Sequence, residues 1–153
     1  MRIYLNFPSK TTNESNLFDS LKKESLSLNG RISIFDLKRL ENVALLCTKE
    51  IEPVYDILIK HSLNEIKCNI PIIISNHSYL ESIADQFNIK YKKINPNDEK
   101  NLLKILEDYD VDLIVLARYM QIIGPNIVSR FENRIINIHH GFLPAFKGSN
   151  PYR

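Results

Sequence analysis

Short, nearly continuous apolar runs separated by helix-like segments dominate the chain from about residue 42 onward. Runs of this length, bounded by polar and turn-forming residues, are typical of buried strands. The predicted strands are Val43–Thr48, Ile70–Ser75, Tyr91–Ile94, Val111–Leu116 and Arg134–Ile138. The helices predicted between them are Pro53–Ser62, a segment capped by Ser78 and ending near Phe87, one from Asn97 or Asp98 to about Tyr109, and one near Pro125–Phe131. This alternation predicts an α/β fold with a parallel sheet covered on both faces.

The first forty residues follow a different pattern. Met1–Phe7 and Arg31–Leu37 alternate apolar and polar positions, as half-buried strands do. A helix is predicted between them, opening at Asn13 and closed by Asn29-Gly30. Its expected apolar face consists of Leu17, Phe18, Leu21 and Leu26. A strand–helix–strand segment of this size cannot bury a core of its own, so we expect it to pack against something, with a domain boundary near residues 38–42.

Composition narrows the class of protein without pointing to a function. The 153 residues are 44% hydrophobic and 25% charged, as in ordinary globular domains. No apolar run approaches the length of a membrane span, and polar residues interrupt the N-terminus before a signal region could develop, which predicts a cytoplasmic protein without membrane contact. Lys and Arg number 20 against 18 Asp and Glu, too balanced for a nucleic-acid partner.

Metal and redox chemistry find little support in the sequence. Cys47 ends an apolar run and is expected to be a buried core thiol, while Cys68 has no CxxC partner. Asp108, Asp110 and Asp112 fall across a helix-to-strand turn, where a solvated turn explains them better than a metal site. The sequence therefore predicts no metal.

Asn137 and His139 form the most informative pair of polar residues. They lie two apart at the carboxyl end of the last predicted strand and therefore project from the same face. An amide beside an imidazole could polarise a carbonyl, stabilise an oxyanion and move a proton near neutral pH. The alternative is that both side chains only satisfy nearby backbone groups.

The other strand ends are less specific. Polar and aromatic residues follow the strand Val111–Leu116 and could frame a cleft for a flat ligand, although Tyr119 and Met120 also suit packing. The turn after Val43–Thr48 contains no glycine, which argues against a dinucleotide or phosphate loop. Helix capping explains Asn76-His77.

Three contiguous segments closely resemble the formyltetrahydrofolate deformylases of the folate-dependent formyltransferase superfamily: Leu116–Ile122, Arg134–His140 and Phe142–Gly148. The likeness runs along essentially the whole chain. It implies a Rossmann-like parallel sheet of the formyltransferase type over residues 41–153, preceded by a partial ACT-like α+β segment over residues 1–40. On this resemblance the chain is expected to be truncated at both ends.

The resemblance also implies an activity. The family hydrolyses 10-formyltetrahydrofolate to formate and tetrahydrofolate, which supplies purine biosynthesis, and uses no prosthetic group. Asn137 and His139 match the first two members of the family's Asn–His–Asp triad. The Asp lies downstream of the Lys-Gly-x-x-Pro loop, past Arg153, so negligible hydrolysis is expected from this chain alone. The positions expected to contact substrate are Arg118, Tyr119, Met120, Gln121, Ile122, Ile123, His140 and Gly141, the last replacing the family's usual serine.

Two alternatives remain open. Glycinamide ribonucleotide formyltransferases carry a Gly-Phe-Met-Arg type of loop and a His-Pro pair, whereas this chain has Arg118-Tyr119-Met120-Gln121 and His139-His140. Methionyl-tRNA formyltransferases fit the charge and length less well. The non-enzymatic alternative is an inactive fragment that acts as a binding or interaction module. The resemblance further implies an amino-acid effector at the ACT-like segment, and a homo-oligomer or a complementing second chain.

Overall fold

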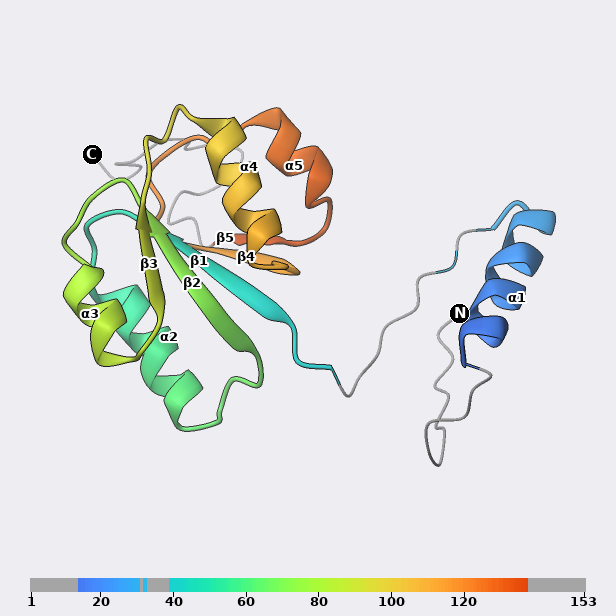
Figure 1. The fold of residues 1–153 in the computed structure, drawn as a ribbon, viewed down its shortest axis with the longest axis horizontal. Helices are drawn as coiled ribbons and strands as arrows, with labels where there is room; N and C mark the ends of the chain where they lie inside the picture. The colour runs from blue at the N-terminus through green and yellow to red at the C-terminus, as the bar shows by residue number, and fades with distance from the viewer. Residues whose placement is uncertain (1–13, 31, 33–38, 138–153) are drawn as a thin grey trace, which may run out of the picture. The chain divides into compact units, whose positions relative to one another are not determined.

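The computed structural model describes residues 14–30, 32 and 39–137 (Figure 1). The chain divides into two units, Met1–Arg39 and Leu40–Arg153. The predicted strand at residues 1–7 lies outside the described residues, as does the strand at 31–37 except for Ile32, which belongs to no helix or strand. Positions 138–153, which include His139, His140 and Gly141, also lie outside them.

In the first unit, the helix α1 spans Glu14–Ser27, as predicted. Asn29 adopts a φ of 52°, and the Gly30 amide donates to the Ser25 carbonyl at 2.7 Å. The left-handed residue that ends the helix is therefore Asn29 and not Gly30. The expected apolar face is shorter than predicted, because Leu26 is 74% exposed.

The second unit contains one parallel sheet, which confirms the predicted fold class. Its strand order is β3-β2-β1-β4-β5, and every neighbouring pair is parallel. The strands are β1 (Asn42–Cys47), β2 (Asn69–Ser75), β3 (Lys90–Lys93), β4 (Leu113–Ala117) and β5 (Ile135–Asn137). They match the five predicted strands with small shifts at their ends.

Helices cover both faces of this sheet (Figure 1). They are α2 (Glu52–Ser62) and α3 (Glu81–Gln86) on one face, and α4 (Glu99–Asp108) and α5 (Pro125–Arg130) on the other. Successive residues of β1 point to opposite faces: Leu45 packs with Leu58 of α2, and Leu46 packs with Leu106 of α4. This double burial explains why the central strands β1, β2 and β4 are apolar runs without alternation.

Two predicted helix starts have different outcomes. Asp98 caps α4 as expected, since its carboxylate accepts a hydrogen bond from the Asn101 amide at 3.1 Å. The predicted Ser78 cap of α3 is wrong: the helix begins after Leu80, and no side chain caps it. The Ser78 carbonyl instead accepts from the Glu81 amide in a turn that precedes the helix. Asn76-His77 accordingly does not cap α3 either.

The helix-to-strand turn after α4 uses one of its carboxylates for structure. Asp110 takes a left-handed φ of 47°, which reverses the chain after the helix. Asp112 Oδ2 accepts a hydrogen bond from the Asn42 amide at the start of β1. The turn therefore anchors β4 beside β1. Asp108 and Asp110 are exposed, as expected of a solvated turn, whereas Asp112 is half-buried and accepts a hydrogen bond from the backbone.

Candidate functional site

The strand order places a topological switch point between β1 and β4. The chain moves outward from β1 through β2 to β3, then returns to the other side of β1 with β4 and continues to β5. The register aligns Ser75, Cys47 and Ala117 in one row, and Asn137 lies opposite Leu116. Open parallel sheets bind ligands beyond the carboxyl ends of their strands at such a point. The candidate site therefore lies beyond this row of strand ends.

The segment that follows β4, residues 118–123, is called here the β4 loop. It begins at Arg118 with a φ of 51°, a left-handed conformation that is uncommon for a side chain of this kind. The Thr48 hydroxyl donates a hydrogen bond to the Arg118 carbonyl at 2.9 Å. The Arg118 guanidinium also lies 3.8 Å from the Glu50 carboxylate, but both side chains are about half exposed, so this ion pair contributes little stability.

Side chains of the β4 loop divide between the core and the solvent. Tyr119 is 7% exposed and packs in the cluster under α4 and α5, with Ile123 packed against the same cluster. Burial raises the pKa of the Tyr119 phenol, as expected of a core residue. Met120 is exposed, and Ile122 is 93% exposed. The Tyr119 side chain therefore serves the core.

Asn137 lies at the end of β5 on the same face of the sheet as the β4 loop. Ile135, two residues earlier, packs against the cluster that also holds Tyr119 and Ile123. Residues two apart in a strand share a face, so Asn137 continues that face past the covering helices, and it is exposed there. The structure thus brings together the β4 loop and Asn137. His139, His140 and Gly141 lie outside the described residues.

Buried hydroxyl groups join the ends of the three central strands, and sequence reasoning missed them. The Ser75 hydroxyl donates to the Thr48 carbonyl at 3.1 Å and accepts from the His77 amide at 3.2 Å. The Tyr91 hydroxyl donates to the His77 carbonyl. Thr48 and Ser75 are both buried. In the sequence, Thr48 and Ser75 can be recognised as hydroxyl residues that come directly after an apolar run.

Glu99 binds the start of α5, the helix that follows the β4 loop. The Glu99 carboxylate of α4 accepts hydrogen bonds from the Asn126 amide at 2.9 Å, the Asn126 side chain at 2.8 Å and the Ile127 amide at 3.2 Å. The Asn126 side chain and these amides hold the pKa of Glu99 below its usual range. Glu99 therefore caps a helix that belongs to a different part of the chain.

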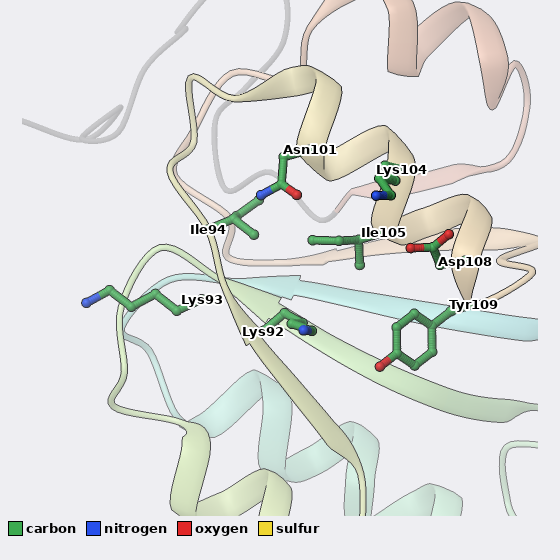
Figure 2. Close-up of a pocket in the computed structure, with 8 residues that line it drawn as sticks. All are labelled: Lys92, Lys93, Ile94, Asn101, Lys104, Ile105, Asp108 and Tyr109. Carbon is green, nitrogen blue, oxygen red and sulfur yellow. The ribbon is translucent and has the colours of Figure 1, made fainter.

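A hollow lies at the opposite edge of the sheet, between β3 and α4 (Figure 2). Its lining combines lysines of both elements with an acidic and an aromatic residue at the end of α4. The lining residues are Lys92, Lys93, Ile94, Asn101, Lys104, Ile105, Asp108 and Tyr109. It is separated from Asn137 by the width of the sheet, so it is not part of the candidate site.

Two structural observations bear on the expectations about metals and membranes. Across residues 14–30, 32 and 39–137, no group of His, Cys, Asp and Glu side chains could hold a metal ion. Within the same ranges, no helix has the length and apolar character needed to cross a bilayer.

Comparison with known proteins identifies what this arrangement resembles. A family model described as formyl transferase matches residues 41–153. A formyltetrahydrofolate deformylase from Synechocystis is 44% identical over 135 residues, which is 84% of this chain and 46% of that protein. The chain spans about half the length of the curated relatives it matches.

Solved structures agree with the sequence relatives. A formyltetrahydrofolate deformylase from Pseudomonas syringae superimposes with a TM-score of 0.81 at 29% identity, covering 90% of this chain and 48% of that one. A glycinamide ribonucleotide transformylase from Geobacillus kaustophilus has a TM-score of 0.68 at 24% identity, covering 74% of this chain and 65% of that one, a likeness of fold alone. The resemblance inferred from the sequence motifs is confirmed.

Proposed function

This chain belongs to the formyl transferase family, and we propose that its second unit carries the folate-binding part of a site that hydrolyses 10-formyltetrahydrofolate to formate and tetrahydrofolate. The observation that carries the proposal is that Asn137 and the β4 loop share one face at one edge of the sheet. The deformylases among its relatives support hydrolysis over other formyl chemistry.

In the proposed reaction, backbone groups of the β4 loop receive the flat pterin ring, since Tyr119 turns its side chain into the core. The Asn137 amide donates a hydrogen bond to the formyl oxygen and stabilises the negative charge that develops when water adds to the formyl carbon. The carbon–nitrogen bond then breaks, formate leaves, and N10 of the folate takes up a proton. His139 is proposed to accept a proton from the attacking water and to deliver it to N10, which balances the protons of the reaction.

The other positions of the proposed substrate contact are residues 118–123, His140 and Gly141. Exposure of Met120 and Ile122 supports contact of their side chains with the faces of a flat ring. Arg118 is half exposed and keeps Glu50 beside it, so its proposed contribution comes from its backbone. Gln121 is half-buried between the two exposed apolar side chains.

A pair of ligands tests the role of Asn137 directly. Folate and 10-formylfolate differ only by the formyl group, so their affinity ratio isolates the contact with the formyl oxygen. We expect the full chain to prefer 10-formylfolate, and Asn137→Ala to lose that preference while it still binds folate. Equal preference in the wild type and the variant would refute the assignment of Asn137.

Turnover requires a separate measurement. Formate release from 10-formyltetrahydrofolate by the full chain is compared with that by His139→Ala and Asn137→Ala. Little formate release is expected from this chain alone, so release above the His139→Ala level would show turnover. Asn137→Ala should then lower kcat by roughly a hundredfold or more, because it removes one donor to the developing oxyanion. Binding without formate release above the His139→Ala level would instead support a binding module.

Formyl transfer to glycinamide ribonucleotide is the second candidate, because transformylases share the fold. That substrate brings a phosphate, and the turn between β1 and α2 offers no glycine to bind it. Adding glycinamide ribonucleotide to the hydrolysis assay separates the two: consumption of formyl folate that depends on the ribonucleotide would favour the transferase.

The remaining expectations concern the whole protein. We propose that the formate supplies purine biosynthesis and that the protein is cytoplasmic. An ACT-like fold for residues 1–40 is supported by the helix α1 between two segments of strand-like alternation. For that segment we propose an amino-acid effector and pairing with a second copy or a complementing chain. Sedimentation with and without single amino acids tests both.

A further inference from the structure

The first residue of the β4 loop is held in an unfavourable backbone conformation by a side chain from another strand. Arg118 has a φ of 51°, a region that Cβ crowding disfavours for side chains other than those of Asn and Asp; it is the only described residue besides Asn and Asp with a Cβ that adopts it. Its carbonyl accepts the Thr48 hydroxyl at 2.9 Å. Because the bond joins residues 70 positions apart, it fixes the loop to the end of β1 rather than to its own neighbours.

Thr48 is itself held from the opposite side. Its carbonyl accepts the Ser75 hydroxyl at 3.1 Å, so one residue at the end of β1 connects to the ends of both β2 and β4. Thr48 is 5% exposed and Ser75 is fully buried. Hydrogen bonds in such a place are well ordered, because breaking one leaves a buried polar group without a partner.

The hydrogen bond from Thr48 to the Arg118 carbonyl also sets the direction of the Tyr119 N–H, which belongs to the same peptide group. The amide between Arg118 and Tyr119 is planar, so its carbonyl and its N–H point in opposite directions. With the carbonyl directed at Thr48, the Tyr119 N–H must point away from β1. Packing of the Tyr119 side chain in the core and the Glu99 cap on Asn126 hold the rest of the loop.

We propose that Thr48 is a positioning residue of the folate site, which orients the backbone of the β4 loop through the Arg118 carbonyl. The inference rests on the proposed function, because it assigns a role within that same site. Backbone recognition of a ligand requires that peptide groups be oriented before binding. Thr48 supplies this orientation without touching the ligand.

Three variants separate positioning from stability. Thr48→Val keeps the shape and removes the hydroxyl, and Thr48→Ser restores a hydroxyl at the same place. Tyr91→Phe is the matched control, because it also removes a hydroxyl that donates to a carbonyl at this edge of the sheet, but at His77 of the β2 end. The full chain is used throughout, and each variant is first compared with wild type by thermal unfolding.

We expect Thr48→Val to bind folate and 10-formylfolate about tenfold more weakly, which corresponds to about 1.4 kcal/mol. Both ligands should weaken equally, since Thr48 acts on the loop and not on the formyl group. Thr48→Ser should bind within about twofold of wild type by the same measure. Tyr91→Phe should lose stability without losing affinity.

Hydrogen exchange of the ligand-free chain gives a readout that does not depend on folate. The Tyr119 and Met120 amides should exchange faster in Thr48→Val than in Tyr91→Phe at equal global stability. Wild-type affinity in Thr48→Val, an equal loss in Tyr91→Phe, or unchanged exchange at Tyr119 would each overturn the role of Thr48. If wild type binds no folate while exchange responds as expected, the proposed function fails and the orientation of the loop by Thr48 stands.

Discussion

The thiol of Cys47 should make the folded chain sensitive to alkali. Cys47 ends β1, is fully buried between Ser75 and Ala117 of the neighbouring strands, and packs with the residues under α2 and α3. Burial raises its pKa from an ordinary 9.0 to about 12, because the thiolate cannot be hydrated there. The unfolded chain therefore loses this proton at a lower pH than the folded chain.

The difference between the two pKa values determines the direction and the size of the change in folding stability with pH. Folding stability from Cys47 is fully present below pH 9 and is lost as the pH rises from 9 toward 12, since the unfolded state is then favoured by ionisation. Each pH unit in this window changes the folding equilibrium by about tenfold. Between pH 8 and pH 11 the loss is about a hundredfold, or about 3 kcal/mol.

Chemical denaturation at a series of pH values measures this loss. Burial also raises the pKa values of Tyr91 and Tyr119. The free energy of unfolding of wild type should therefore fall more steeply with rising pH than Cys47 alone would cause. The comparison is therefore with Cys47→Ala, which should be less stable at pH 8 but should lose less stability between pH 8 and pH 11. Cys68→Ala is the control and should keep most of the wild-type slope. Parallel curves for wild type and Cys47→Ala would refute the reasoning.

Three further predictions concern helices and core. A Cβ on Gly124 would collide with the Glu99 carboxylate, so Gly124→Ala should lower the melting temperature of the wild-type protein. In the Glu99→Ala background there is no such clash, and alanine fits the Gly124 φ of −71°, so the same substitution should stabilise the protein by about 0.5 kcal/mol. A double-mutant cycle in which the effect of Gly124→Ala does not change sign would contradict the cap. Asp98→Ala should cost about 1 kcal/mol in the free energy of unfolding and Asp98→Asn much less, measured by urea denaturation. Leu58→Ala should cost about 2–5 kcal/mol by the same assay, whereas its half-exposed neighbour Ile59→Ala should cost far less; similar losses would mean that α2 packs differently.

The parallel sheet could be predicted because its signal is repeated and local. Every central strand is an apolar run of the length that burial on both faces requires, and the helices between them leave little choice of connection. The start of α3 could not be predicted in the same way. Ser78 has the right chemistry for a cap, but a turn through the Ser78 carbonyl delays the helix to Glu81. Competing turn geometries depend on packing that the local sequence does not specify.

In the candidate site, too, the sequence identifies some residues and not others. Asn137 could be identified because a polar residue at the end of an apolar strand stands out, and the contiguous motifs reinforced it. The left-handed Arg118 could not, since its conformation depends on a hydrogen bond to Thr48 far away in the sequence. Packing is an expected role for both Tyr119 and Met120, but only the Tyr119 ring lies in the core, while Met120 is exposed. Sequence spacing indicates which strand ends meet, but not which side chains there serve the ligand and which serve the loop.

In the proposed reaction, the switch point favours water over a phosphate-bearing molecule as the acceptor of the formyl group. Dinucleotide and phosphate sites leave this place open, with glycine amides and a helix N-terminus directed at the anion. Here the end of β1 is joined to the β4 loop by the Thr48 hydrogen bond, and Glu50 lies beside Arg118. A phosphate bound beside Arg118 would meet the Glu50 carboxylate, which already lies next to that cation, whereas water needs no such site.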